Sequence, residues 1–190
     1  KNMGALFSHL KGFEQATGDY ILMAAADDYL LPGIFELSLG LLAKYPQAGL
    51  CSSKSRRINE NGDYLDSVPE PPYASKHPCY LPKEKMLNLM LKRDNWHIIV
   101  TTALFNRKML IESKALDPAI GDYFDGFAML LMAVNYGACY IPQELGVHRV
   151  LKNSRSSASR SNPETHLQEV FPMWKLMDTT YADRFPPRFR

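Results

Sequence analysis

Two adjacent carboxylates, Asp27 and Asp28, follow an unbroken apolar run at residues 20–26. Neighbouring carboxylates repel each other, so this arrangement is costly unless a cation or hydrogen-bond donors hold them. Their oxygens are hard ligands suited to Mg²⁺ or Mn²⁺, and such ions typically bridge a nucleotide diphosphate. Helix capping is the alternative role, because an acid near a first turn stabilises the helix dipole. Since Pro32 fits the first helical position and makes Leu31 the cap, both acids lie too far upstream, and we expect a cation site.

A third carboxylate, Asp125, opens an apolar segment at residues 125–136, which Gly137 ends as a C-terminal cap. A carboxylate at the mouth of an apolar helix is partly desolvated, which raises its pKa toward the range of a general base. Capping is the commonest use of an aspartate at a helix start, and Asp125 can do both. Asp122 lies three residues upstream, and we favour a loop acid or a helix cap for it.

The elements that must position these acids alternate between helix and strand. An amphipathic helix is expected around residues 6–13, a buried strand at 20–26, a helix at 34–44 and a strand at 48–53. This order predicts an α/β fold with a mostly parallel, Rossmann-like sheet flanked by helices. Further helices are expected at residues 83–92, 125–136 and 163–181, and strands at 98–105 and 138–141. We expect one principal domain at residues 1–160, followed by a C-terminal helix and a basic aromatic tail at 161–190.

The composition excludes several classes of protein. The chain has 190 residues, 46% of them hydrophobic, which suffices for a core and excludes a disordered tail. Its net charge of +2 argues against a dedicated nucleic-acid binder. The cysteines (Cys51, Cys79 and Cys139) are widely spaced, and no apolar run approaches the roughly 20 residues that span a bilayer. We therefore expect a cytoplasmic protein. Its Arg- and Ser-rich stretch at 152–160 and its basic tail at 184–190 allow peripheral contact with anionic lipid on the inner face of the membrane.

Several short motifs occur in a fixed order along the chain. They are Lys1-Asn-Met-Gly4, Ala16-Thr-Gly-Asp-Tyr-Ile21, Ala26-Asp-Asp-Tyr-Leu-Leu-Pro-Gly33, Asn95 with Arg107, Leu116-Asp117-Pro118, Asp125-Gly-Phe127, and Tyr140-Ile-Pro-Gln-Glu-Leu145 with Arg149. As an ordered set they resemble the family-two inverting nucleotide-sugar glycosyltransferases, and the resemblance extends from residue 1 to about residue 160. It implies the glycosyltransferase A-type fold.

The resemblance also implies a role for each matching residue. Asp28 is expected to bind Mn²⁺ or Mg²⁺, and Asp27 to contact the nucleotide ribose or assist the metal. Arg149 is expected in the donor site, and Asp125 as the base that deprotonates the acceptor hydroxyl. Asp122 is the rival base, and the preference for Asp125 depends on its distance to Gly137 in the family pattern. The donor would be a UDP-, GDP- or dTDP-linked sugar, and the acceptor a glycan or a lipid-linked glycan. The cation would act as a Lewis acid on the leaving diphosphate.

Other features depart from the family pattern. Ala26 replaces the first acid of a strict D-x-D motif, and Leu151 stands where many relatives have a histidine, so we expect His148 to be structural. The first βα units of the uridine-binding half are absent, which makes the chain either a fragment or unable to hold a nucleotide normally. The alternatives are an inactive glycosyltransferase-like binding or scaffolding domain and, with less support, a glycoside hydrolase. Trp96 and His97 are candidates for an acceptor pocket.

Overall fold

The protein is described from a computed structural model that covers residues 3–65, 74–92, 100–152, 154, 159 and 161–187. Of Lys92 and Asp122 only the backbone is described. The acceptor-side candidates Asn95, Trp96 and His97 lie outside the described residues, as does most of the Arg- and Ser-rich stretch.

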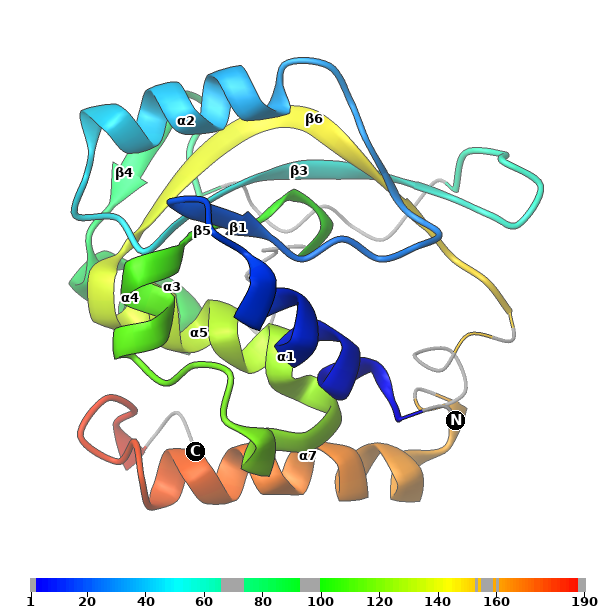
Figure 1. The fold of residues 1–190 in the computed structure, drawn as a ribbon, viewed down its shortest axis with the longest axis vertical. Helices are drawn as coiled ribbons and strands as arrows, with labels where there is room; N and C mark the ends of the chain where they lie inside the picture. Colours follow the sequence, from blue (N-terminus) through cyan, green and yellow to red (C-terminus); the bar gives the residue numbers. More distant parts are fainter. Residues whose placement is uncertain are drawn as a thin grey trace.

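A six-stranded sheet forms the centre of the described fold, and β3 and β6 are its two long strands (Figure 1). The strand order is β1-β5-β3-β6-β2, and β4 pairs with another part of β6. The strands are β1 (Tyr20–Leu22), β2 (Tyr29–Leu30), β3 (Leu50–Ile58), β4 (Cys79–Leu81), β5 (Leu104–Asn106) and β6 (Ala138–Arg149).

The expectation of a mostly parallel sheet is not confirmed, because the sheet is mixed. Only the pairing of β3 with β6 is parallel among the described strands, and the pairings β1·β5, β3·β5, β2·β6 and β4·β6 are antiparallel. These pairings make β1, β3 and β6 run in one direction, as the helix–strand alternation predicts. The short strands β2, β4 and β5 run in the opposite direction and lie between or beside them. The coarser prediction of an α/β fold is confirmed.

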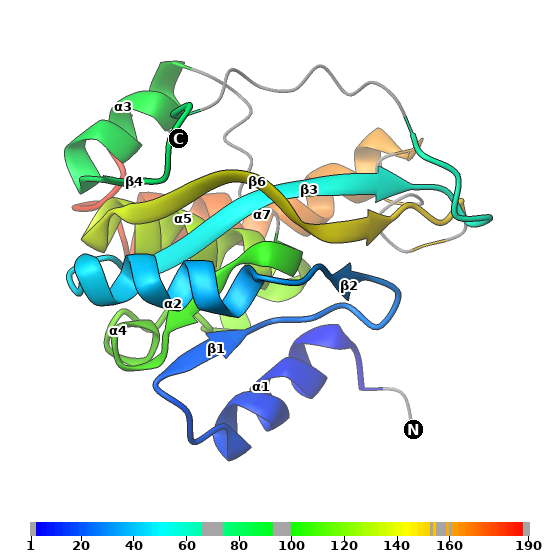
Figure 2. The same cartoon turned by 90° about the horizontal axis from the view of Figure 1, so that it is seen from above.

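Helices cover both faces of the sheet (Figures 1 and 2). Helix α2 lies on one face, whereas α3, α4 and α5 lie on the other, and α7 packs outside α5. The helices are α1 (Ala5–Gln15), α2 (Ile34–Lys44), α3 (Lys83–Lys92), α4 (Arg107–Glu112), α5 (Phe124–Tyr136) and α7 (Pro163–Asp178), with 3₁₀ turns η1 (Val100–Thr102) and η2 (Pro118–Tyr123). None of the helices in the described parts of the chain is long and apolar enough to cross a membrane.

Two apolar clusters fill the space on either side of the sheet. Because successive side chains of a strand point to opposite faces, neighbouring residues belong to different clusters. Leu50 and Phe105 pack on the α5 side, whereas Cys51 and Leu104 pack on the α2 side. The α5 side also includes Met177, Tyr181 and Phe185, so the C-terminal helix and the turns after it share this core.

The helix boundaries follow the sequence pattern more closely than the strand boundaries do. The helices expected at 34–44, 83–92 and 125–136 are confirmed to within one residue, although Gly33 rather than Leu31 caps α2. The strand expected at 20–26 ends at Leu22, and residues 24–26 are exposed. Within the stretch expected as a strand at 98–105, residues 100–102 form a 3₁₀ turn and β5 starts only at Leu104.

Candidate functional site

The side chain of Asp28 is almost completely buried, and donors from two distant segments converge on its carboxylate. Its side chain is 3% exposed. The backbone N–H of Arg149 donates to Oδ1 at 2.9 Å, and the Thr101 hydroxyl donates to Oδ2. The Nδ1 atom of His148 lies 3.2 Å from Oδ1 and 3.3 Å from Oδ2. Because a carboxylate only accepts hydrogen bonds, this contact requires the imidazole proton on Nδ1.

The pairing of β2 with β6 brings Asp28 to these partners. Tyr29 pairs with Val147, which places the preceding residue, Asp28, beside the end of β6. Gly146 then lets the η1 turn approach β6, since a Cβ atom there would lie only 2.6 Å from Cγ2 of Thr102. This close approach carries Thr101 to the carboxylate.

Two opposing effects act on the pKa of Asp28. Burial raises the pKa of this carboxyl group, whereas the hydrogen bonds from His148, Thr101 and the Arg149 backbone lower it, and the net pKa lies below the ordinary value. Asp28 is therefore ionised at neutral pH, and hydrogen-bond donors of this chain stabilise its charge.

The contacts of the acid pair leave little room for a divalent cation. A metal ligand needs a lone pair that faces the ion, but in Asp28 both oxygens already accept hydrogen bonds and face protein atoms. Asp27 is half-buried and has no hydrogen-bond or ion-pair partner within the described residues. The described part of the chain contains no group of three or more His, Cys, Asp or Glu side chains placed to hold a metal ion. In this conformation Asp28 faces hydrogen-bond donors of the chain, and Asp27 is the member of the pair that is open to a cation.

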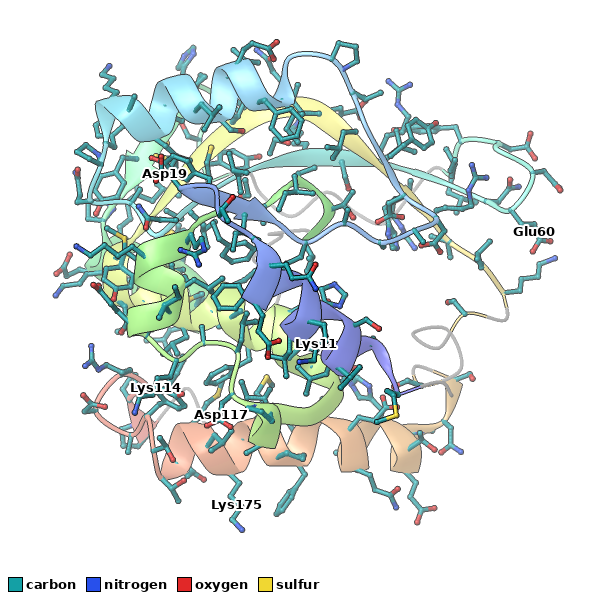
Figure 3. All side chains as sticks on the ribbon, viewed as in Figure 1. Lys11, Asp19, Glu60, Lys114, Asp117 and Lys175 are labelled. Atoms are coloured by element: carbon teal, nitrogen blue, oxygen red, sulfur yellow. The ribbon has the colours of Figure 1, made fainter. Side chains whose placement is uncertain are left out.

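The side chain of Arg149 makes further contacts near the same end of β6. Its Nη1 donates to the carbonyl oxygens of Asn59 and Glu60, at 3.3 and 3.4 Å, in the turn after β3. Lys152 forms an ion pair with Glu60 at 3.4 Å, and Figure 3 shows Glu60 at the outer end of this turn. The expected donor-binding arginine therefore fastens the end of β6 to the β3 turn.

Asp125 lies in the first turn of α5, where Tyr123 rather than an aspartate is the N-cap residue. Burial raises the pKa of Asp125, while the backbone N–H of Gly126, 2.6 Å from Oδ1, and the charge of His9 lower it less strongly, so the net pKa is raised. The His9 ring packs against the ring of Phe124, with centroids 4.8 Å apart. Asp125 thus combines partial burial, a raised pKa and a neighbouring imidazole, which suits a proton acceptor.

A pocket of about 380 Å³ lies between α1 and the chain that leaves β1. Its lining includes Ser8, His9 and Phe13 of α1, residues 21–24 and Leu116. This volume lies within the usual range of small-molecule sites, about 300–1,000 Å³. His9 lines the pocket and also packs beside the first turn of α5, so one side chain connects the pocket with the residues around Asp125.

The candidate residues fall into two groups. Asp28 and Arg149 meet at the end of β6, whereas none of the described contacts joins Asp125 to either of them. Sequence reasoning identified neither Thr101 nor His9 as a site residue. Nothing in the local sequence distinguishes Thr101, because its partner lies 73 residues away. The side chain of the rival base Asp122 lies outside the described residues.

Comparison with known proteins adds no assignment. Neither a scan of protein-family models nor a search of curated proteins finds a match for this chain. A functional assignment therefore depends on the geometry of the two groups of residues.

Proposed function

We propose that the chain carries the acceptor half of an inverting glycosyltransferase, with Asp125 as the general base. The observation that carries this proposal is the half-buried Asp125 carboxylate, whose pKa is raised by desolvation, beside His9, which lines a sugar-sized pocket. Ionisable groups whose pKa is shifted by desolvation are concentrated at functional sites.

The proposed reaction needs only one base. Asp125 accepts the proton of an acceptor hydroxyl while that oxygen forms a bond to the anomeric carbon of the donor sugar. The bond from this carbon to the diphosphate oxygen breaks on the opposite face, and the electron pair leaves with the nucleoside diphosphate. A raised pKa makes Asp125 a stronger base than an ordinary aspartate. His9 orients the acceptor as it approaches Asp125 from the pocket.

The donor side of the proposal involves Asp27, Asp28 and Arg149. A UDP-, GDP- or dTDP-linked sugar remains the proposed donor, and a glycan or a lipid-linked glycan the proposed acceptor. Mn²⁺ or Mg²⁺ at Asp27 and Asp28 stays a prediction, and no step of the proposed reaction uses it, because Asp28 and Arg149 are occupied by structural contacts. Asp27 is the member of the pair that is open to a ligand.

The finer fold assignment, an A-type glycosyltransferase without its first βα units, belongs to the same proposal. It is supported by the common direction of β1, β3 and β6 and by the position of β1 at one end of the described strand order. In this fold the first βα units would add strands to the sheet beside β1. A cytoplasmic location with peripheral membrane contact also remains a proposal.

One observation favours the alternative of an inactive binding or scaffolding domain. The hydrogen bonds that neutralise Asp28 replace the cation that the family pattern places there. In that case the fold is retained while the donor chemistry is lost. No described contact favours a glycoside hydrolase.

Transfer assays on the full chain distinguish the two candidates. Released nucleoside diphosphate is measured with UDP-, GDP- and dTDP-sugars and a set of glycan acceptors. We expect Asp125→Asn to lower turnover by about 10²–10⁴-fold while donor binding, measured by calorimetry, is retained. Asp122→Asn is the matched control and should keep its turnover. Full turnover in Asp125→Asn would contradict the assignment of the base, and the absence of both donor binding and turnover in the unmodified chain would favour the scaffold.

A further inference from the structure

Helix α7 carries an apolar stripe that faces away from the protein. Leu167, Phe171 and Trp174 are 53, 62 and 44% exposed, which is high for large apolar side chains. Their spacing of four and three residues places them within an arc of about 60° on one side of the helix. The buried side chains Val170 and Met177 are centred about 80° from the middle of this arc. The stripe is therefore a surface distinct from the one that packs on the core.

Opposite charges flank the stripe at its two ends. Glu164 lies in the first turn of α7, and Lys175 lies in the last. They are eleven residues apart, which is close to three full turns, so they lie on the same side of the helix about 16 Å from each other. Neither has an ion-pair partner within the described residues, and Figure 3 shows Lys175 pointing away from the body of the protein.

This pattern is complementary to itself. In an antiparallel copy of α7, with the two-fold axis midway between Glu164 and Lys175, each glutamate lies opposite the lysine of the other copy. In the same arrangement Leu167 comes level, to within about 2 Å along the axis, with Phe171 of the other copy. The two phenylalanines then lie on either side of the axis. One alignment thus satisfies both the charges and the apolar residues.

We propose that α7 is a homodimerisation helix, which pairs antiparallel with α7 of a second copy through Leu167, Phe171 and Trp174. Such an interface is isologous, as expected for a two-fold dimer. The charge of the helix favours a second copy over a lipid surface. Glu164, Glu169 and Asp178 outnumber Lys175, so α7 is net acidic and an anionic membrane would repel it. Membrane-surface helices usually carry Lys and Arg on the polar face instead.

The test is the mass of the full chain in solution. Sedimentation equilibrium between about 1 and 200 µM should show association to about twice the 21.6 kDa of one chain. Phe171→Glu places a charge in the stripe and should leave a monomer. Phe35→Glu is the matched control, because Phe35 is a 47% exposed phenylalanine on α2, and it should still dimerise. Circular dichroism checks that each variant is folded.

A charge exchange provides a second, independent test that keeps the apolar stripe intact. Glu164→Lys and Lys175→Glu alone should each weaken dimerisation by about tenfold, because like charges then face each other across the axis. The double exchange should restore it. A monomer at 200 µM, or a dimer that is unaffected by Phe171→Glu, overturns the proposal. So does a monomer that binds vesicles of phosphatidylglycerol and phosphatidylethanolamine through Phe171, since that result assigns the stripe to a membrane.

Discussion

Removal of the Asp28 carboxylate should destabilise the protein strongly, although the residue lies in a loop. In Asp28→Ala, the Arg149 N–H, the Thr101 hydroxyl and His148 lose their shared acceptor. Hydrogen bonds to a charged group contribute about 1.5–3 kcal/mol each. Thr101 can rotate toward another acceptor, and water reaches His148, whose side chain is 31% exposed, so both losses are partly recovered. We expect a net loss of about 3 kcal/mol, or about 6–12 °C in Tm.

The measurement is urea denaturation at pH 7, followed by circular dichroism. Asp28→Asn should lose only about 1 kcal/mol, because its amide oxygen still accepts from Arg149 N–H. Asp27→Ala is the control next in sequence and should stay within about 0.5 kcal/mol of the parent protein. Because the folded state lowers the pKa of Asp28, the difference between parent and Asp28→Ala should persist at neutral pH and shrink as the pH falls below 3.8, through the lowered pKa. A loss below about 1 kcal/mol for Asp28→Ala would refute the proposed role.

Two further predictions concern the other acids. Asp125→Asn should stabilise the protein at pH 7, because the folded state raises the pKa of Asp125 and its ionisation therefore opposes folding. This gain in the free energy of unfolding should appear as the pH rises above 3.8 and vanish below it. A gain that does not depend on pH in urea titrations would argue against burial as the cause. If a cation binds at the acid pair, Mn²⁺ with UDP should raise the Tm. Asp27→Asn should abolish that rise more completely than Asp28→Asn, because only Asp27 of the pair is open to a ligand. An equal loss of the rise in both variants would support Asp28 as a ligand.

The helices could be predicted from the sequence because their signals are local. The apolar segment at residues 125–136 marks α5, and Gly137 ends this helix with a φ of 73°. The same reasoning identified the buried segments at the start of β3 and β6, where apolar runs are covered on both faces of the sheet. Their direction could also be inferred, since β1, β3 and β6 run the same way.

The partner order in the sheet could not be predicted, because it depends on contacts between distant segments. Strand β5 lies between β1 and β3, although it follows β3 by more than 40 residues. Its three residues carry no signal for this position or for its antiparallel direction. The antiparallel pairing of β2 with β6 likewise depends on a two-residue strand that no periodicity reveals.

The contacts of Asp28 illustrate the same limit. An acid pair after a buried strand repels itself and must be neutralised, and that inference from the sequence holds. The donors that stabilise Asp28 come from segments 73 and 121 residues away: η1 positions the Thr101 hydroxyl, and β6 positions the Arg149 N–H. A cation and a set of hydrogen-bond donors meet the same electrostatic requirement, so the local motif is compatible with either. The contacts of each acid distinguish these two possibilities, because Asp28 faces protein donors and Asp27 does not.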